Sequence, residues 1–245
     1  MSKEFNIDPI KRVFVALDTS DFNHGLKLAQ TLKGMVGGIK IGKEFFTAYG
    51  PEGAKKIADT GLPLFLDLKF HDIPNTVAGA VRAAISLSPF LLNVHATGGR
   101  AMLEAAKDAA AEEAQLRGIQ RPLILAVTVL TSLDETDFKE LGLNNSSDDQ
   151  VKRLASLAQE SGVDGVVCSA REIEIIRATC GNNFKILTPG IRPRWATSGD
   201  QKRVVSPFTA LSKGADYLVI GRPITSSDDP IAAIRLLEIE LNNDG

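Results

Sequence analysis

The chain has 245 residues, of which 44% are hydrophobic, and a formal net charge of -2 at pH 7. This composition can bury one substantial core, so we expect a single domain over residues 1–245. So small a net charge provides no general attraction for nucleic acid or for an anionic membrane surface, and neither partner is expected. The first residues lack the apolar stretch of a signal peptide and no apolar run reaches 18 residues, which predicts a cytoplasmic protein.

Short apolar runs and helical stretches alternate through the first half of the chain. The first strand, residues 13–17, ends at Asp18, and the second, residues 37–42, contains Lys40. A third apolar run leads into a polar stretch, and a fourth strand ends at His95. The third and fourth runs cover residues 62–66 and 90–94, and helices are expected around Leu26, Ala29 and Leu32 and over residues 44–59 (interrupted at Pro51), 77–87 and 98–117.

The second half of the chain repeats this alternation. Strands are expected at residues 123–130, 165–168, 184–187 and 217–220, and helices at residues 151–158, 171–179, 208–213 and 230–241. Two stretches break the pattern: residues 133–147 are acidic, with room for a short helix, and residues 188–201 form a long loop without apolar periodicity. Long ordered loops of this kind are usually functional.

Eight strands that alternate with eight helical stretches predict a (β/α)8 TIM barrel with its active site at the carboxyl ends of the strands. An open doubly wound sheet is the alternative. No G-x-G-x-x-G follows the first strand, however, and unusual polar residues stand at the ends of six strands. A barrel brings such residues to one mouth, whereas an open sheet would scatter several of them.

The polar stretch at residues 67–76, D-L-K-F-H-D-I-P-N-T, places two acids around one lysine. Alternate side chains of an extended strand share a face, so Asp67 and Lys69 are expected to point the same way, with Asp72 just past the strand end. A structural ion-pair network would explain the set. The chemical interpretation is that Asp67 destabilises a substrate carboxylate, while the Lys69 ammonium stabilises the carbanion left by loss of carbon dioxide and then protonates it.

Two other mechanisms fit the residues less well. A Schiff base on Lys69 needs a neutral amine, and the adjacent carboxylates favour the ammonium form. A metal-bound enediolate would need a second acid at the end of strand two, where Lys40 stands. Only three histidines and two widely spaced cysteines are present, so no metal site is predicted.

A phosphate site is expected at the loops after strands seven and eight, where barrels commonly bind this group. Gly221 allows close approach of a ligand to the backbone, and Arg222 offers a forked cation. Arg192 and Gln201 can add donors from the long loop. The alternative is that Gly-Arg-Pro only turns the chain.

Several motifs in order resemble one family. These are V-A-L-D at strand one, I-K-I-G at strand two, D-L-K-F-H-D-I-P-N-T, V-L-T-S at strand five, T-P-G-I-R and G-D-Q-K-R in the long loop, and V-I-G-R-P-I at strand eight. Together they resemble orotidine 5'-phosphate decarboxylases of the bacterial type, from about Arg12 to Ile224. Each motif is weak alone, but the ordered set is highly specific.

The resemblance implies conversion of orotidine 5'-monophosphate to uridine 5'-monophosphate and carbon dioxide in de novo pyrimidine synthesis, without a cofactor. It implies that Lys69 donates the proton and that Asp67 lies against the substrate carboxylate. Its other implications concern substrate binding: Asp18 and Lys40 would contact the ribose, Thr131 the pyrimidine, and Gln201, Gly221 and Arg222 the phosphate, with Arg192 close by.

The resemblance further implies a homodimer with shared active sites, in which Asp72, Ile73 and Thr76 enter the neighbouring subunit's site. His71 is interpreted as structural, since the family's chemistry needs no imidazole, and His95, which could face the mouth, is interpreted as scaffold. Two alternatives remain: a metal-dependent sugar-phosphate decarboxylase or aldol-type synthase on the same barrel, and a non-catalytic module that binds nucleotide phosphate.

Overall fold

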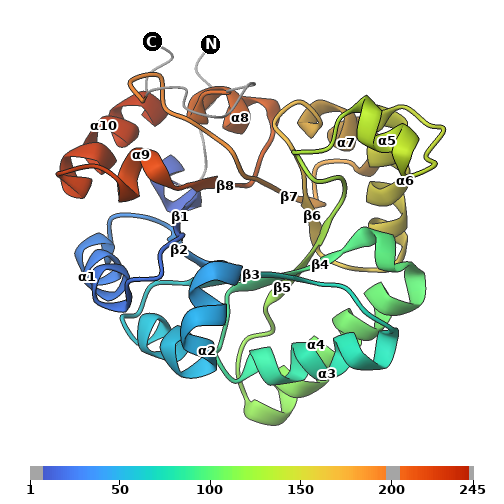
Figure 1. The fold of residues 1–245 in the computed structure, drawn as a ribbon, viewed down its shortest axis with the longest axis horizontal. Coiled ribbons are helices and arrows are strands. Elements are labelled where there is room, and N and C mark those ends of the chain that lie inside the picture. The colour runs from blue at the N-terminus through green and yellow to red at the C-terminus, as the bar shows by residue number, and fades with distance from the viewer. Residues whose placement is uncertain (1–7, 197–204, 243–245) are drawn as a thin grey trace.

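A closed barrel of parallel strands forms the centre of the molecule, and helices surround it (Figure 1). The computed structural model describes residues 8–196 and 205–242. Neighbouring strands pair in chain order, and β8 pairs with β1 to close the barrel, which confirms the predicted TIM barrel over the open sheet. The strands are β1 (Val13–Leu17), β2 (Gly38–Ile41), β3 (Leu64–Phe70), β4 (Leu91–His95), β5 (Leu123–Val127), β6 (Gly165–Val167), β7 (Lys185–Thr188) and β8 (Tyr217–Ile220).

The outer helices begin at capping side chains that the sequence supplies. Asp21 and Ser146 accept hydrogen bonds from backbone N–H groups in the first turns of their helices, and Asp134 forms a capping box with Asp137. Two 3-10 turns, Pro9–Arg12 and Ala96–Gly98, complete the described elements. The helices are α1 (Phe22–Leu32), α2 (Lys43–Ala58), α3 (Pro74–Ile85), α4 (Arg100–Arg117), α5 (Glu135–Glu140), α6 (Ser147–Glu160), α7 (Ile173–Cys180), α8 (Pro207–Lys213), α9 (Arg222–Thr225) and α10 (Pro230–Asn242).

The apolar core has two parts, one between the strands and the helices and a smaller one inside the barrel. Phe14 lies at the centre of the inner part, with its ring edge-on to that of Phe65 and stacked with that of Phe90. Gly38 makes room for it, because a Cβ atom there would lie 2.3 Å from the Phe14 ring. These residues come early in their strands, so apolar side chains fill the amino end of the barrel and leave the carboxyl end for polar groups.

Several details differ from the predicted elements, among them β3, which extends to Phe70 instead of ending with the apolar run at residue 66. Strand β5 ends at Val127, not at residue 130, and the backbone N–H of Thr128 instead donates to Val167 on β6. The interruption at Pro51 is present, but Gly50 carries it with a φ of 60°, since proline disfavours helical backbone at the residue before it. A short helix, α9, follows β8 directly. None of the described helices is both long and apolar enough to cross a membrane.

Candidate active site

Four charged side chains from the first three strands meet at the carboxyl end of the barrel. The Lys40 ammonium lies 2.8 Å from Asp18 Oδ1 and 3.4 Å from Asp67 Oδ2. The Lys69 ammonium lies 2.5 Å from Asp67 Oδ1. We call these four residues the charged cluster. The contacts run from Asp18 to Lys40, from Lys40 to Asp67 and from Asp67 to Lys69, so negative and positive groups alternate. Each ammonium therefore has a carboxylate partner within the protein.

Lys69 reaches Asp67 through an irregular part of β3. Leu66 pairs with Leu92 of β4 and Phe70 pairs with Val94, so the three residues 67–69 lie opposite the single residue Asn93. Lys69 has a φ of 53°, a left-handed conformation that is uncommon for a residue with a side chain. Asp67 and Lys69 are close together, as predicted. Their proximity results from a bulge, however, whereas the prediction assumed the regular alternation of side chains along a strand.

Asn93 is a member of the site that the sequence reasoning missed. Its side chain is fully buried in the barrel, where its amide Nδ2 donates to Asp67 Oδ1 at 2.8 Å. Its Oδ1 accepts a hydrogen bond of 2.8 Å from the backbone N–H of Lys69. The sequence did contain a sign of this role, since Asn93 is the one polar residue in the apolar run L-L-N-V of β4. A buried amide needs hydrogen-bond partners for both its oxygen and its nitrogen.

The environment of Asp67 keeps its carboxylate charged. Burial alone would raise the pKa of this group, but the positive charges of Lys40 and Lys69 and the hydrogen bonds from Lys69 and Asn93 bring its pKa below the ordinary value. Its side chain is only 12% exposed. A substrate carboxylate placed beside it would therefore meet a fixed negative charge in a poorly solvated position.

Two histidines border the cluster. The rings of His71 and His95 have their centroids 5.4 Å apart. Burial, followed by electrostatic interactions with His71, Lys43 and Lys69, lowers the pKa of His95 to about 4. The His95 imidazole is therefore neutral at pH 7 and adds no further positive charge beside Lys69.

The predicted phosphate-binding residues lie on two neighbouring loops. Gly221 is next to the charged cluster, since a Cβ atom there would lie 3.5 Å from the Ala16 Cβ and 4.0 Å from Asp18 Oδ2. Arg222 begins α9 directly after it. Gln201 lies outside the described residues.

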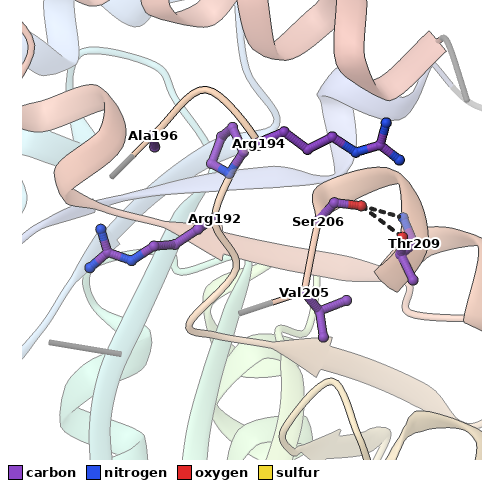
Figure 2. A pocket seen from close by; sticks show the side chains of 7 residues that line it. Arg192, Arg194, Ala196, Val205, Ser206 and Thr209 are labelled. Carbon is purple, nitrogen blue, oxygen red and sulfur yellow. Dashed lines mark hydrogen bonds between the residues drawn. The ribbon is translucent and has the colours of Figure 1, made fainter. Parts of the chain in front are cut away.

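Arg192 is buried in the loop after β7, and its backbone N–H donates to Val205. It lines a cavity of about 400 Å³ together with residues at both ends of the loop. Figure 2 shows the side chains of Arg192 and Arg194 leaving the loop in opposite directions. The backbone N–H of Arg194 donates to the carboxylate of Glu240 on α10, at 3.0 and 3.2 Å, which ties this end of the loop to the outer helix layer.

The remaining predicted site residues are exposed and lie apart from the charged cluster's ion pairs. Asp72 accepts a hydrogen bond from the backbone N–H of Ile73, whose side chain is 67% exposed. Thr76 is exposed in the first turn of α3, and Thr131 is exposed in the turn after β5. Ile73 therefore presents an apolar side chain to solvent beside a carboxylate at the start of a helix.

The acids at the mouth are not arranged as metal ligands. In residues 8–196 and 205–242, no group of three or more His, Cys, Asp or Glu side chains lies together in a geometry that could hold a metal ion. Both carboxylate oxygens of Asp67 already face ammonium groups, Lys69 on one side and Lys40 on the other. This set is suited to holding an anionic substrate between fixed charges.

Known proteins resemble this chain over nearly its whole length. The sequence model of the Orotidine 5'-phosphate decarboxylase / HUMPS family matches residues 11–237. The orotidine 5'-phosphate decarboxylase of Rhodospirillum rubrum is 56% identical over 94% of this chain and 93% of the relative, and that of Moorella thermoacetica is 52% identical over 94% and 92%. The crystal structure of orotidine 5'-phosphate decarboxylase from Lactobacillus acidophilus has a TM-score of 0.82 at 36% identity, over 94% of this chain and 99% of that one.

Proposed function

Because the chain belongs to the orotidine 5'-phosphate decarboxylase / HUMPS family, we propose that it converts orotidine 5'-monophosphate to uridine 5'-monophosphate and carbon dioxide. This reaction is the last step of de novo pyrimidine synthesis. The observation that carries the proposal is the charged cluster at the barrel mouth, in which the buried carboxylate of Asp67 contacts two ammonium groups.

In the proposed mechanism, the bond between C6 of the pyrimidine and its carboxylate breaks, carbon dioxide leaves, and the electron pair stays on C6. Asp67 lies against the substrate carboxylate, and the repulsion between them ends when the neutral product departs. The Lys69 ammonium stabilises the carbanion at C6 and donates its proton to that carbon. The bulge at Lys69 supports this role, since it turns the ammonium toward Asp67.

Substrate binding is assigned to the surrounding residues. Asp18 and Lys40 hydrogen-bond the ribose hydroxyls, because a hydroxyl can donate to the Asp18 carboxylate and accept from the Lys40 ammonium. Gly221, Arg222, Arg192 and Gln201 bind the phosphate, and Thr131 contacts the pyrimidine. The position of Gly221 next to Asp18 supports this division, because it puts the phosphate loop beside the ribose site.

The metal-dependent members of this superfamily provide the second candidate function. They would need a carboxylate metal ligand at the end of strand two, where this chain has Lys40 in contact with Asp67. The test is the ultraviolet absorbance change of orotidine monophosphate in excess EDTA. We expect full activity with the chelator. Loss of activity that a divalent metal restores would favour the metal-dependent alternative, and no turnover in either condition would refute the proposed function.

The active protein is proposed to be a homodimer in which Asp72, Ile73 and Thr76 complete the neighbouring subunit's site. The exposure of these three residues at the start of α3 supports this arrangement. A cytoplasmic location is proposed as well. Both cysteines, Cys168 and Cys180, are free thiols, as is usual in a reducing compartment.

A further inference from the structure

Asn93 is buried within the charged cluster, and the proposed mechanism leaves it without a role. It lies on β4 with its Cα in register with Leu125 of β5, and its side chain is 0% exposed. Burying an amide without hydrogen bonds destabilises a protein. Here both ends of the amide have partners on β3, and those partners are Asp67 and Lys69.

We propose that Asn93 is the positioning residue that holds the β3 bulge and thereby places the Lys69 ammonium on Asp67. The bulge sets residues 67–69 against a single β4 residue, so the backbone N–H of Lys69 cannot take part in a regular ladder. The side-chain Oδ1 of Asn93 accepts that N–H at 2.8 Å. It replaces the missing backbone acceptor where Lys69 has a φ of 53°.

The other end of the same amide fixes the carboxylate. Nδ2 of Asn93 and Nζ of Lys69 both donate to Oδ1 of Asp67, at 2.8 and 2.5 Å. One side chain therefore contacts both the backbone of the proton donor and the carboxylate beside it. A backbone N–H can only donate and a carboxylate can only accept, so the residue at position 93 must present an acceptor and a donor a fixed distance apart.

Asparagine meets this requirement, and its close analogues do not. Aspartate can accept the Lys69 N–H, but as an anion it repels Asp67. Leucine has a similar volume and offers neither group. Glutamine is longer by one methylene, in a position with no exposed surface. The inference rests on the proposed function for its kinetic consequences, whereas its structural consequence for Lys69 is independent of the substrate.

The test compares Asn93→Asp and Asn93→Leu with the wild type. In both variants we expect kcat for orotidine monophosphate to fall about 100-fold at pH 8 with little change in KM, because the reacting groups are displaced while the phosphate site is intact. Ser161→Ala is the matched control, since it removes another buried side-chain hydrogen bond far from the mouth. A kcat within about threefold of the wild type in Asn93→Leu would overturn the inference.

The Asn93→Asp variant supplies a readout that a packing role alone would not change. In this variant the carboxylates of positions 67 and 93 are adjacent, and repulsion between them favours binding of a proton. A protonated carboxyl at position 93 has one donor and one acceptor, as the amide of Asn93 does. The ratio of its kcat to that of the wild type is expected to rise about tenfold between pH 8 and pH 5. Asp67, Lys40, Lys69 and His95 face the site in both proteins, so the ratio of the two kcat values reports on the group at position 93. A ratio independent of pH would overturn the inference.

A crystal structure of Asn93→Leu separates this inference from the proposed function. We expect Lys69 to leave its left-handed conformation and its ammonium to move away from Asp67. A bulge that persists with the ammonium on Asp67 would overturn the inference even if the wild type decarboxylates orotidine monophosphate. Wild-type protein that does not turn over this substrate would refute the proposed function, and the conformation of Lys69 in the variant would still decide the role of Asn93.

Discussion

At the scale of single residues, Asp67 is the centre of the site. Moving a carboxylate into a position with 12% exposure costs several kcal/mol unless opposite charges and hydrogen bonds compensate. Lys40, Lys69 and Asn93 provide that compensation. The carboxylate therefore stays ionised without being neutralised by a proton, which is the state that repels a substrate carboxylate.

Replacing the proposed proton donor tests this arrangement directly. We expect Lys69→Ala to remain folded and to lose at least about 10³-fold in kcat, since it removes both the proton and the charge that stabilises the carbanion. The decarboxylation rate of the variant checks the loss of activity, and its circular dichroism spectrum checks that it is folded. Lys55→Ala, an exposed lysine on α2 that pairs with Asp59, is the control. Activity near the wild-type level in Lys69→Ala would remove Lys69 from the proposed role.

His95 makes stability depend on pH in a defined window. Its pKa is about 4 in the folded protein, where burial is the largest cause, against an ordinary value of 6.5. Between these two values the unfolded chain binds more protons, so the free energy of unfolding falls as the pH falls from 6.5 toward 4. The partial exposure of the ring limits the effect to about 1 kcal/mol.

The matching variant is His95→Gln, which has no titrating group at this position. Urea denaturation at several pH values between 4 and 7 should show a smaller loss of stability on acidification than in the wild type. Asp67 contributes little in this window, because its pKa lies below the ordinary 3.8. Parallel stability curves for the two proteins would show that His95 does not cause the dependence.

At the scale of elements, the loops after β7 and β8 carry the groups proposed to bind phosphate. Gly221 and Arg222 connect β8 to α9 without an intervening loop, so Arg222 is attached to a strand of the rigid barrel. The loop after β7 is fixed at its near end by the hydrogen bonds from Arg194 to Glu240 on α10. Binding energy from a remote phosphate can be used to organise the reacting groups.

Arg222→Ala tests this use of remote binding energy. We expect KM to rise and kcat to fall about 100-fold, although Arg222 is proposed to bind the phosphate and not the reacting carbon. The reason is that the phosphate would no longer hold the pyrimidine against Asp67 and Lys69. Steady-state kinetics measure both constants, with Arg235→Ala on α10 as an exposed arginine control. A change in KM alone would mean that Arg222 only adds affinity.

At the scale of the whole molecule, one predicted catalytic group, Asp72, lies outside the charged cluster of its own barrel. The charged cluster lies at the mouth, whereas Asp72 and Ile73 are exposed at the start of α3. In a two-fold symmetric dimer the same surface of each subunit contacts the other. Each subunit would then contribute Asp72 to its partner's cluster.

Mixing two inactive variants tests shared sites. Asp72→Ala and Lys69→Ala should each be inactive, but in a mixed dimer one of the two sites has both residues intact. Refolding an equal mixture should therefore restore roughly a quarter of wild-type activity, because half of the dimers are mixed. The pair Asp67→Ala and Lys69→Ala is the control, since both residues belong to the same site and no mixed dimer is complete. Equal recovery in the two mixtures would contradict the shared site.

The alternation of apolar runs with helical stretches was sufficient to predict the barrel, since strand and helix periodicities are local properties of the chain. The same local patterns indicated Asp18, Lys40, Asp67 and Lys69, because charged residues at the ends of apolar strands are conspicuous. Barrel closure then brings strand ends together wherever they stand in the sequence. The gathering of these strand ends at one mouth thus followed from pattern and topology, whereas the contact between Lys69 and Asp67 did not.

Only the tertiary structure identified the bulge in β3 and the role of Asn93. The left-handed conformation of Lys69 has no signal in D-L-K-F, because a conformation that is unfavourable in itself exists only where neighbouring strands stabilise it. Asn93 is 24 residues from Lys69 along the chain, and an asparagine within an apolar strand does not reveal which groups it will contact. The sequence determined which charges come to the mouth of the barrel, and packing between β3 and β4 decided how Lys69 is turned toward Asp67.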